Sequence, residues 1–240
     1  MTKKQINQND TFNSELLNSI GNDYVFDNNP INRLKNKDIN LNKKNENKAY
    51  ELIELKKKID SIKDCALKKN SKLIIFGDGN MNSPLMIIGE APDEKDEISG
   101  KTFSGENGTL LKKMLLAINI KKENIYSTYA VNYRPPHNAK PTTDEIKRYS
   151  FFLQKHISII NPKLIILMGS TAMQSLTGIN KKISLERGVW KDIIIKNISY
   201  TTMITFNPSY LLRIPENKKY SWEDLKKIKK KITDLNLIIE

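Results

Sequence analysis

Three short polar segments carry residues that could perform chemistry, and each directly follows an apolar run. Glu90-Ala91-Pro92 follows "LMIIG", "RPPHN" (134–138) follows "NIYSTYAVNY", and "NPSYLLR" (207–213) follows "SYTTMITF". If these runs are strands of one parallel sheet, their carboxyl ends meet at one edge, where such sheets bind ligands. The spacing therefore predicts a single site built from the three segments.

Glu90 is the first candidate for catalysis. A carboxylate at the end of a buried strand can polarise or position a water molecule, or lie beside a ligand held by the neighbouring backbone. Pro92 and the polar loop after it are expected to keep the backbone extended, so that its N–H groups face the ligand. The structural alternative is that Glu90 caps the next turn.

Phe103 lies in "GKTFSGENG", where small residues flank the aromatic ring. Such a ring in a loop at a strand end is a natural platform for stacking a nucleic-acid base. The alternative is that Phe103 tucks the loop onto the core. The nearby glycines match neither the dinucleotide fingerprint nor a phosphate-binding loop.

The "NPSYLLR" segment predicts a rigid turn with two exposed leucines and an arginine. Leu211 and Leu212 would suit a wedge pushed into a stacked duplex, with Arg213 on a phosphate. The alternative is an ordinary turn with both leucines in the core.

The charge of the chain favours a polyanionic partner. The formal net charge is +13 and the hydrophobic content is 38%, and such a charge is typical of proteins that bind nucleic acid. A lysine-rich proteome with solvated lysines is the alternative reading. The basic residues spread over 48–72, 112–122, 181–196 and 213–231, which predicts a charged face on a folded domain.

Cysteine and histidine usage argues against a metal site built from these side chains. Cys65 is the single cysteine, so a disulfide framework is excluded and a cytosolic, cytoplasmic location is expected. His137 is predicted in an exposed loop and His156 on a helix surface, and neither has a second ligand at metal spacing. No apolar stretch is long enough for a signal core or a membrane span.

Continuous apolar strands that alternate with helices predict an α/β fold, a three-layer αβα sandwich around a central, mostly parallel sheet. Thr142 and Glu145 form a capping box for one helix, Gly178 ends another, and Ser221 is the expected N-cap of the last. The expected strands are 72–76, 85–89, 124–133, 162–169, 189–195 and 199–206, and the expected helices are 47–64, 108–118, 143–160, 170–178 and 221–235.

The N-terminal part differs in composition from the rest. Residues 1–48 predict a low-complexity, Asn/Lys-rich extension that is partly disordered, with a short helix near 12–20 and a linker over 27–47. Residues 49–240 form the predicted α/β domain.

Five motifs in this order resemble the uracil-DNA glycosylase superfamily, and most closely its type-4 branch. The resemblance runs from about residue 50 to 237. The motifs are "GEAPDEKDEISGKTFSGENGTLL", "YRPPHNAKPT", "PKLIILMG", Arg187-Gly188-Val189-Trp190 and "NPSYLLR".

The resemblance implies hydrolysis of the N-glycosidic bond of a uracil, or a related damaged base, that is flipped out of DNA. By matched position, Phe103 stacks the base, and Glu90 with Ala91 and Pro92 lies by the water and the sugar. Asn207 donates to the base O2. The implied DNA contacts are Arg134, Ser209, Leu211, Leu212 and Arg213.

The family usually carries four cysteines that hold an iron–sulfur cluster. The two later positions are Tyr133 and Tyr149 here, and the best match for the earlier pair is Ile62 and Cys65. One thiolate cannot hold such a cluster, so its absence is predicted, with aromatic and aliphatic packing in its place.

Three further departures touch the chemistry. Asn207 replaces the motif histidine, Tyr129 replaces the asparagine that reads the base, and Asp93 replaces a glycine. They leave open a catalytically degenerate member of the fold that binds DNA without base excision. An unrelated α/β nucleotide-binding or protein-interaction module is the third hypothesis. The expected partner is DNA, with no membrane, and the expected state is a monomer.

Overall fold

The computed structural model describes residues 33–239. The chain divides into two compact units, Met1–Lys43 and Lys44–Glu240, and the sheet belongs to the second. The helix expected near residues 12–20 lies outside the described residues. Helix α2 (Arg33–Asp60) includes residues 33–47, so the prediction of a linker over that stretch is wrong.

Six strands form one sheet in the order β1-β3-β2-β4-β6-β5. The four central strands β3, β2, β4 and β6 are parallel, and the two edge strands pair antiparallel with their neighbours. The strands are β1 (Asp78–Gly79), β2 (Leu85–Gly89), β3 (Tyr126–Tyr129), β4 (Leu164–Met168), β5 (Trp190–Ile195) and β6 (Ile198–Thr205).

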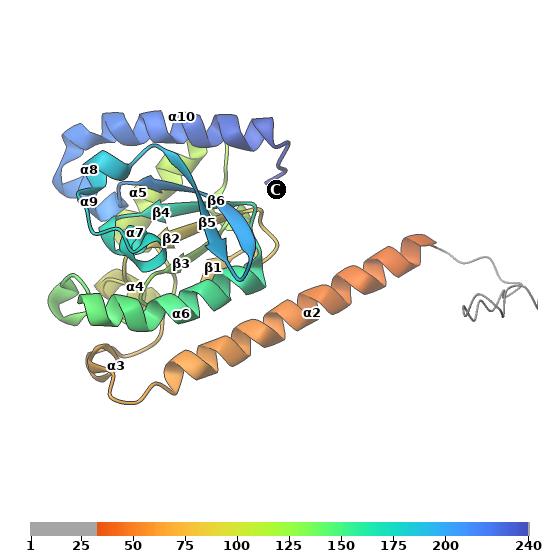
Figure 1. Ribbon diagram of the computed structural model, residues 1–240, viewed down its shortest axis with the longest axis horizontal. Coiled ribbons are helices and arrows are strands. Elements are labelled where there is room, and N and C mark those ends of the chain that lie inside the picture. Colours follow the sequence, from red (N-terminus) through yellow and green to blue (C-terminus); the bar gives the residue numbers. More distant parts are fainter. Residues whose placement is uncertain (1–32, 240) are drawn as a thin grey trace, which may run out of the picture. The chain divides into compact units, whose positions relative to one another are not determined.

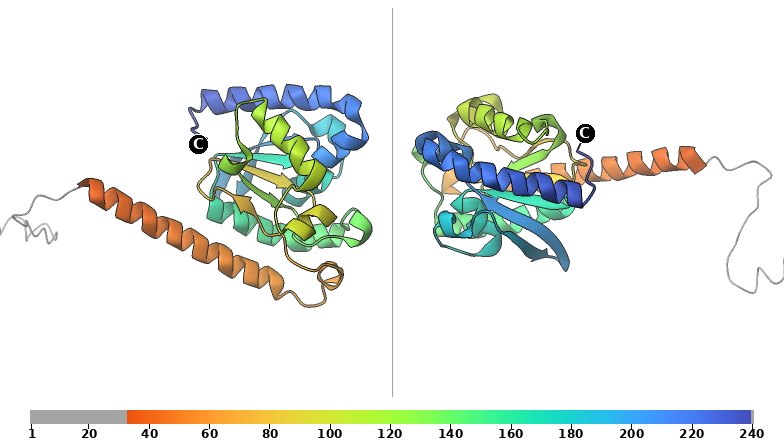
Figure 2. Two further views of the ribbon diagram at one scale, coloured as in Figure 1. Left: turned by 180° about the vertical axis from the view of Figure 1, so that it is seen from behind. Right: turned by 90° about the horizontal axis from the view of Figure 1, so that it is seen from above.

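Helices cover both faces of the sheet, because successive apolar residues of a strand point to opposite sides. Met86 and Ile88 join one core cluster, together with residues of α6 (Thr143–Ile160) and α7 (Ser170–Thr177). Leu85 and Ile87 join the other, which we call the α5–α10 core cluster because it includes residues of α5 (Gly105–Leu116) and α10 (Lys218–Asp234). This three-layer αβα arrangement confirms the predicted fold class (Figures 1 and 2).

The remaining helices have between 4 and 18 residues. They are α3 (Ala66–Asn70), α4 (Glu94–Ser99), α5 (Gly105–Leu116), α6 (Thr143–Ile160), α7 (Ser170–Thr177), α8 (Ile183–Glu186), α9 (Pro208–Arg213) and α10 (Lys218–Asp234), with 3₁₀ turns at Lys122–Asn124, Pro136–Asn138 and Pro215–Asn217. No described helix is long and apolar enough to cross a membrane.

Capping residues predicted two helix ends correctly and one wrongly. The Thr142 side chain and Glu145 form the predicted capping box at the start of α6, and Gly178 ends α7 in the left-handed conformation. The predicted N-cap Ser221 is wrong, since α10 begins one turn earlier, after Asn217. Ser221 is instead buried inside the helix.

The expected strand over residues 72–76 is not part of the regular ladder. The backbone there is held by Ile75 N–H donating to the Asn132 carbonyl and by the Thr128 hydroxyl donating to the Phe76 carbonyl at 2.5 Å. The short strand β1 follows it instead.

His156 is buried, with 2% of its surface exposed, so its predicted place on a helix surface is wrong. It stacks on Phe76, and its Nε2 pairs with the Tyr126 hydroxyl at 2.8 Å. Burial lowers the pKa of His156 to about 3, which keeps the ring neutral in the core. His137 is exposed, as predicted.

Candidate active site

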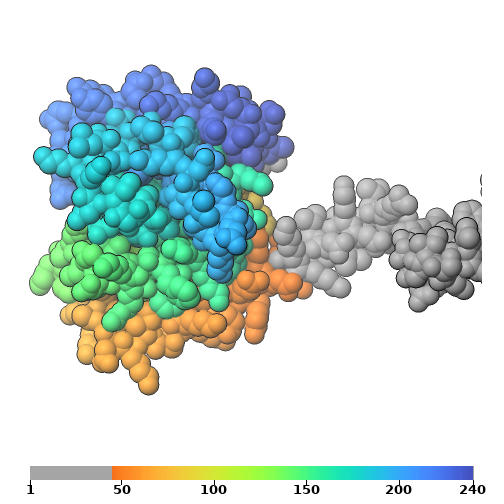
Figure 3. Space-filling view, in the orientation of Figure 1, coloured from red at the N-terminus to blue at the C-terminus, as the bar shows by residue number. Residues whose placement is uncertain are grey.

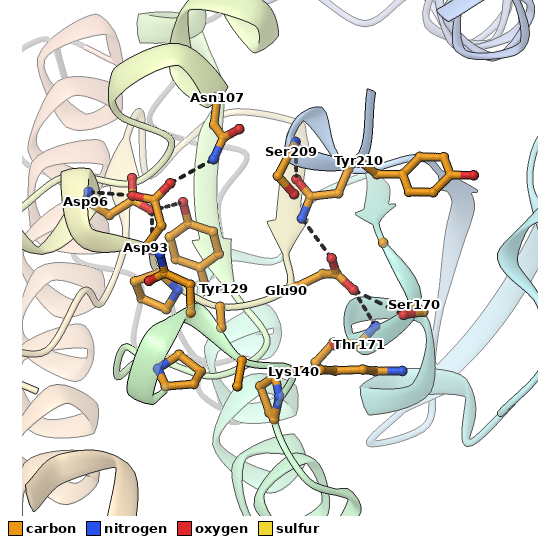
Figure 4. Close-up of a pocket in the computed structure, with 18 of the residues that line it drawn as sticks. Glu90, Asp93, Asp96, Asn107, Tyr129, Lys140, Ser170, Thr171, Ser209 and Tyr210 are labelled. Atoms are coloured by element: carbon orange, nitrogen blue, oxygen red, sulfur yellow. Dashed lines mark hydrogen bonds between the residues drawn. The ribbon is translucent and has the colours of Figure 1, made fainter. Parts of the chain in front are cut away.

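A cavity of about 580 Å³ opens at the carboxyl ends of the central strands. It lies where the chain order reverses, with β3 on one side of β2 and β4 on the other, the position where open α/β sheets bind ligands. Of the residues predicted for the site, Glu90, Ala91, Pro92, Phe103, Tyr129, Asn207, Ser209 and Arg213 line the cavity. Figure 4 shows most of this lining.

Glu90 extends from the end of β2 towards the first turn of α7. Its Oε1 accepts hydrogen bonds from the Thr171 backbone N–H at 2.9 Å and the Ser170 hydroxyl at 3.2 Å. The helix N-terminus adds favourable electrostatics for a carboxylate. Glu90 therefore does cap a helix, but the capped helix is α7, not the next turn along the chain.

Gly169 makes this approach of Glu90 possible. A Cβ atom at residue 169 would lie 2.3 Å from the carboxyl carbon of Glu90, and the backbone φ of 105° also disfavours other residues. The glycine in "PKLIILMG" is thus required where β4 passes under the carboxylate.

Asn207 follows strand β6 and contacts the Glu90 oxygen that does not face α7. It is the N-cap of α9, and its Oδ1 accepts from the Ser209 N–H at 3.4 Å. Its Nδ2 donates to Glu90 Oε2 at 3.1 Å (Figure 4). An amide NH₂ has two protons to donate, so one remains for a ligand. The pair forms a carboxylate and an oriented amide donor at one wall of the cavity.

The opposite wall is formed by Phe103 and Tyr129. The centroids of the two rings lie 5.0 Å apart, and the ring planes are inclined at 36°. Each residue is at most 3% exposed. Phe103 adopts a left-handed backbone conformation, and its N–H donates to the Tyr129 hydroxyl at 2.8 Å. The Lys122 ammonium donates to the Thr102 and Phe103 carbonyls, which fixes the loop further.

Tyr129 in turn donates to Asp96. Its hydroxyl lies 2.7 Å from Asp96 Oδ2, and burial together with this carboxylate raises the pKa of the Tyr129 hydroxyl well above its ordinary value. Burial also raises the pKa of the Asp96 carboxyl, against the hydrogen bonds that it accepts from Tyr129 and from the N–H groups of Asp93 and Ser104.

The predicted extended loop after Pro92 is wrong, because α4 begins there. Asp93 is the N-cap of α4 and forms a capping box with Asp96. The Asp93 N–H donates to Asp96, so it does not face a ligand. In the capping box, Asp93 Oδ1 accepts from the Asp96 N–H at 3.0 Å. Asp93 Oδ2 accepts from Asn107 Nδ2 at 2.7 Å. Asp93 thus lies on the Tyr129 side of the cavity, away from Glu90 (Figure 4).

The predicted DNA contacts separate into exposed and internal residues. Arg213 is exposed at the mouth of the cavity, and Leu212 is 37% exposed. Leu211 is 1% exposed and belongs to the core, so only one of the two leucines is on the surface. Arg134 forms an ion pair with the buried Glu97 at 3.3 Å and lies outside the cavity lining.

Sequence reasoning missed several polar residues of the cavity. The D-x-x-D spacing of Asp93 and Asp96 is a capping signal that could have indicated α4. Ser170 and Thr171 carry no such signal, since they reach Glu90 only through the fold. The missed lining residues with polar side chains are Asp96, Asn107, Lys140, Ser170 and Thr171.

The positions matched to cluster cysteines do come together in one core cluster. Cys65, Tyr133 and Tyr149 are buried there, with Ile62 packed against them. Cys65 Sγ lies 3.3 Å from the Tyr149 hydroxyl, and the Tyr133 hydroxyl donates to Asp60 at 2.6 Å. One thiol and two engaged tyrosines do not fit an iron–sulfur cluster. The described residues also contain no group of three His, Cys, Asp or Glu side chains placed to hold a metal ion.

Comparison with known proteins agrees with the motifs. Residues 76–228 match the model of the uracil DNA glycosylase superfamily. The chain is similar to a type-4 uracil-DNA glycosylase of Thermotoga maritima, at 34% identity over 69% of this chain and 86% of the relative. Enzymes of the same name from Sulfurisphaera tokodaii and Saccharolobus solfataricus are 33% and 31% identical, over 74% and 73% of this chain and 83% and 84% of those relatives.

Proposed function

The chain belongs to the uracil DNA glycosylase superfamily, and from that premise we propose that it hydrolyses the N-glycosidic bond of uracil, or a related damaged base, in DNA. The observation that carries the proposal is the Glu90–Asn207 pair at one wall of a cavity whose other wall is aromatic. The substrate base must leave the stacked helix to enter such a cavity.

In the proposed reaction, bond cleavage leaves positive charge on the sugar and negative charge on the base. The Glu90 carboxylate lies where it can face the sugar and orient the attacking water. The oxygen of that water bonds to the sugar, and its proton neutralises the base anion. The second Nδ2 proton of Asn207 donates to the base O2, where the negative charge develops. In comparable oxyanion sites, one such donor lowers the activation barrier by about 3 kcal/mol.

The contact with DNA is proposed to use the exposed residues around the mouth. Arg213 and Lys140 line the opening and would bind phosphates, while Leu212 would fill the gap left by the flipped nucleotide. Phosphate contacts release counterions, so binding is expected to weaken steeply with salt. Leu211 has no part in this contact, because it lies in the core.

A second candidate is DNA binding without excision, and the Tyr129 wall favours it. Phe103 is almost fully buried against Tyr129, and the Tyr129 hydroxyl already donates to Asp96 and accepts from Phe103 N–H. A base can stack on Phe103 only if this ring pair opens. If it does not open, the protein holds DNA and leaves the glycosidic bond intact.

One assay separates the two candidates. Oligonucleotides with a single uracil, either single-stranded or paired with guanine or adenine, are incubated with excess protein and then treated with alkali, which cuts at abasic sites. Binding is measured on the same oligonucleotides by fluorescence anisotropy. Excision predicts strand cuts at the uracil position. Tight, salt-sensitive binding with no cuts would establish the second candidate in place of the first.

A further inference from the structure

A second cavity, of about 490 Å³, lies between the start of β5 and helix α10. Its lining comprises Gly188, Val189, Trp190, Lys227, Lys230, Lys231 and Asp234, and we call it the Trp190 groove. None of these residues has a role in the reaction proposed above. In the space-filling view, the blue surface of α10 lies directly above the cyan surface of the segment that leads into β5 (Figure 3).

The groove combines an aromatic ring with ammonium groups. Trp190 is half-buried, and one side of it packs against the α5–α10 core cluster. Lys231 Nζ lies 5.9 Å from the ring centroid, and Val189 beside it is 55% exposed. An aromatic ring among cations is the arrangement that stacks bases and holds the backbone of single-stranded nucleic acid.

The charge of the groove is positive. Three lysines face a single carboxylate, that of Asp234. Lys227 donates to the Gly188 carbonyl at 2.7 Å, while Lys230 is exposed and forms no ion pair with any described residue. A polyanion is therefore the occupant with complementary charge.

The groove adjoins the candidate active site through the backbone. Gly188 N–H donates to the Ile204 carbonyl, and the Arg187 guanidinium lies 5.6 Å from the ring centroid of Phe206, which directly precedes Asn207. Trp190 pairs with Met203 across the β5–β6 ladder. One strand spacing of about 4.8 Å and four residues of about 3.3 Å place Trp190 roughly 14 Å from Asn207, or about four steps of a stacked strand.

We propose that the Trp190 groove binds the DNA strand that flanks the nucleotide in the active-site cavity. Trp190 stacks on a base about four nucleotides away, in the place that the Lys231 ammonium occupies over its ring. The displaced Lys231 and the neighbouring Lys230 contact phosphates. The choice of DNA as the occupant rests on the proposed function. The groove itself is tested by binding alone, so its test does not depend on base excision.

The first experiment compares neighbouring lysines of α10. The dissociation constant for a uracil-free, single-stranded oligonucleotide is measured against salt concentration for Lys230→Gln and for the control Lys229→Gln. Lys229 is exposed on the same helix but does not line the groove. Loss of one phosphate contact at 0.1 M salt should weaken binding about fivefold and lower the salt slope by about 0.7. Equal effects of the two variants would overturn the proposal.

A variant that is expected to bind DNA more tightly controls for loss of binding caused by misfolding. Asp234→Asn removes the one carboxylate of the groove and should tighten binding severalfold, while it leaves both flanking lysines in place. A protein damaged by substitution does not bind more tightly. Unchanged or weaker binding by Asp234→Asn would contradict a phosphate backbone in the groove.

The stacking contact can be observed directly, because the chain has two tryptophans. Trp222 is exposed on α10, and Trp222→Phe leaves Trp190 as the single indole. Oligothymidine should quench its fluorescence, and salt should reverse the quenching. Anisotropy that reports binding while Trp190 emission stays constant would show that DNA bypasses the groove. If the protein releases no uracil but oligothymidine still quenches Trp190 fluorescence, the proposed function is wrong and DNA binding in the groove is supported.

Discussion

The two walls of the active-site cavity differ in how much hydrogen-bonding capacity they leave for a ligand. On the Glu90 wall, Asn207 retains one amide proton beyond the one that it donates to the carboxylate. On the Tyr129 wall, the tyrosine hydroxyl both donates to Asp96 and accepts from Phe103 N–H. The Glu90 wall therefore keeps a hydrogen-bond donor for a ligand, whereas the hydroxyl of the Tyr129 wall is already hydrogen-bonded within the protein.

This difference locates the family departures that matter most. Asn207 stands where the family motif has a histidine, but it still presents a donor beside Glu90, so the donor that the proposed function needs is kept. Tyr129 stands where the family motif has an asparagine, and its large ring packs on Phe103, so under the proposed function the base edge would be read differently. We therefore expect changes at the Glu90 wall to affect the rate of base release and changes at the Tyr129 wall to affect which base is released.

The largest expected effect comes from Glu90. Glu90→Gln keeps the shape and the acceptor for Thr171 N–H but removes the charge, and base release should fall about 10³-fold. Single-turnover cleavage of a uracil oligonucleotide measures it. Glu94→Gln, an exposed change of the same kind at the start of α4, should have no effect. Equal rates for the two variants would remove Glu90 from the mechanism.

Asn207→Ser should follow, with a loss of about 10²- to 10³-fold. Serine is a good N-cap residue, so α9 is kept while the amide donor to the base is lost. Asn207→His restores a longer donor and should retain activity. Thermal unfolding of both variants checks that the fold is intact. Full activity of Asn207→Ser would mean that another group stabilises the leaving base.

Tyr129→Asn tests the Tyr129 wall and should raise the rate of uracil release. Removal of the ring opens space against Phe103 and supplies an amide to read the base edge, so uracil release should rise about tenfold, the equivalent of roughly 1.4 kcal/mol in the barrier. The measurement is the rate on uracil beside the rates on other damaged bases. A lower rate on every base would show that Tyr129 itself contacts the substrate.

The smallest effect is a pH dependence of stability that arises from Asp96. Burial raises the pKa of this carboxyl in the folded protein above its ordinary 3.8, so between the two values the folded state binds more protons than the unfolded state. This contribution to stability is present below pH 3.8 and is lost as the pH rises through the folded-state pKa.

Denaturant unfolding at several pH values checks this expectation. Asp96→Asn should gain stability relative to the unmodified protein as the pH rises through that window. Tyr129→Phe removes a hydrogen bond that lowers the Asp96 pKa, so it should move the window to higher pH. A constant difference between Asp96→Asn and the unmodified protein at every pH would contradict the raised pKa.

Local signals predicted the framework of the fold well. The apolar runs at β2 and β4 and the Thr142–Glu145 capping box depend on adjacent residues, and all appear in the structure. Helix α4 was missed although Asp93 and Asp96 carry a capping pattern, because five charged residues in a row suggested a loop. The stretch 72–76 failed for another reason: its partners, Thr128 and Asn132, lie more than fifty residues away.

The site was predictable where a motif places residues at strand ends, as for Glu90 and Asn207. The expectation that both leucines are exposed holds for Leu212 alone, since Asn207 as N-cap and Pro208 at the first helical position start a helix. Successive residues of a helix point about 100° apart, so Leu211 enters the core while Leu212 stays at the surface. Contacts such as Thr171 with Glu90 exist only through the fold, and nothing in the adjacent sequence indicates them.

Direct detection of free uracil by mass spectrometry tests the central claim most directly. Excess protein is incubated with uracil-containing single-stranded DNA, and the released base is quantified against the DNA supplied. We expect release to approach one uracil for each uracil site, and about 10³-fold slower release with Glu90→Gln. Binding of the same DNA with no free uracil after prolonged incubation would show that the protein binds DNA without base excision.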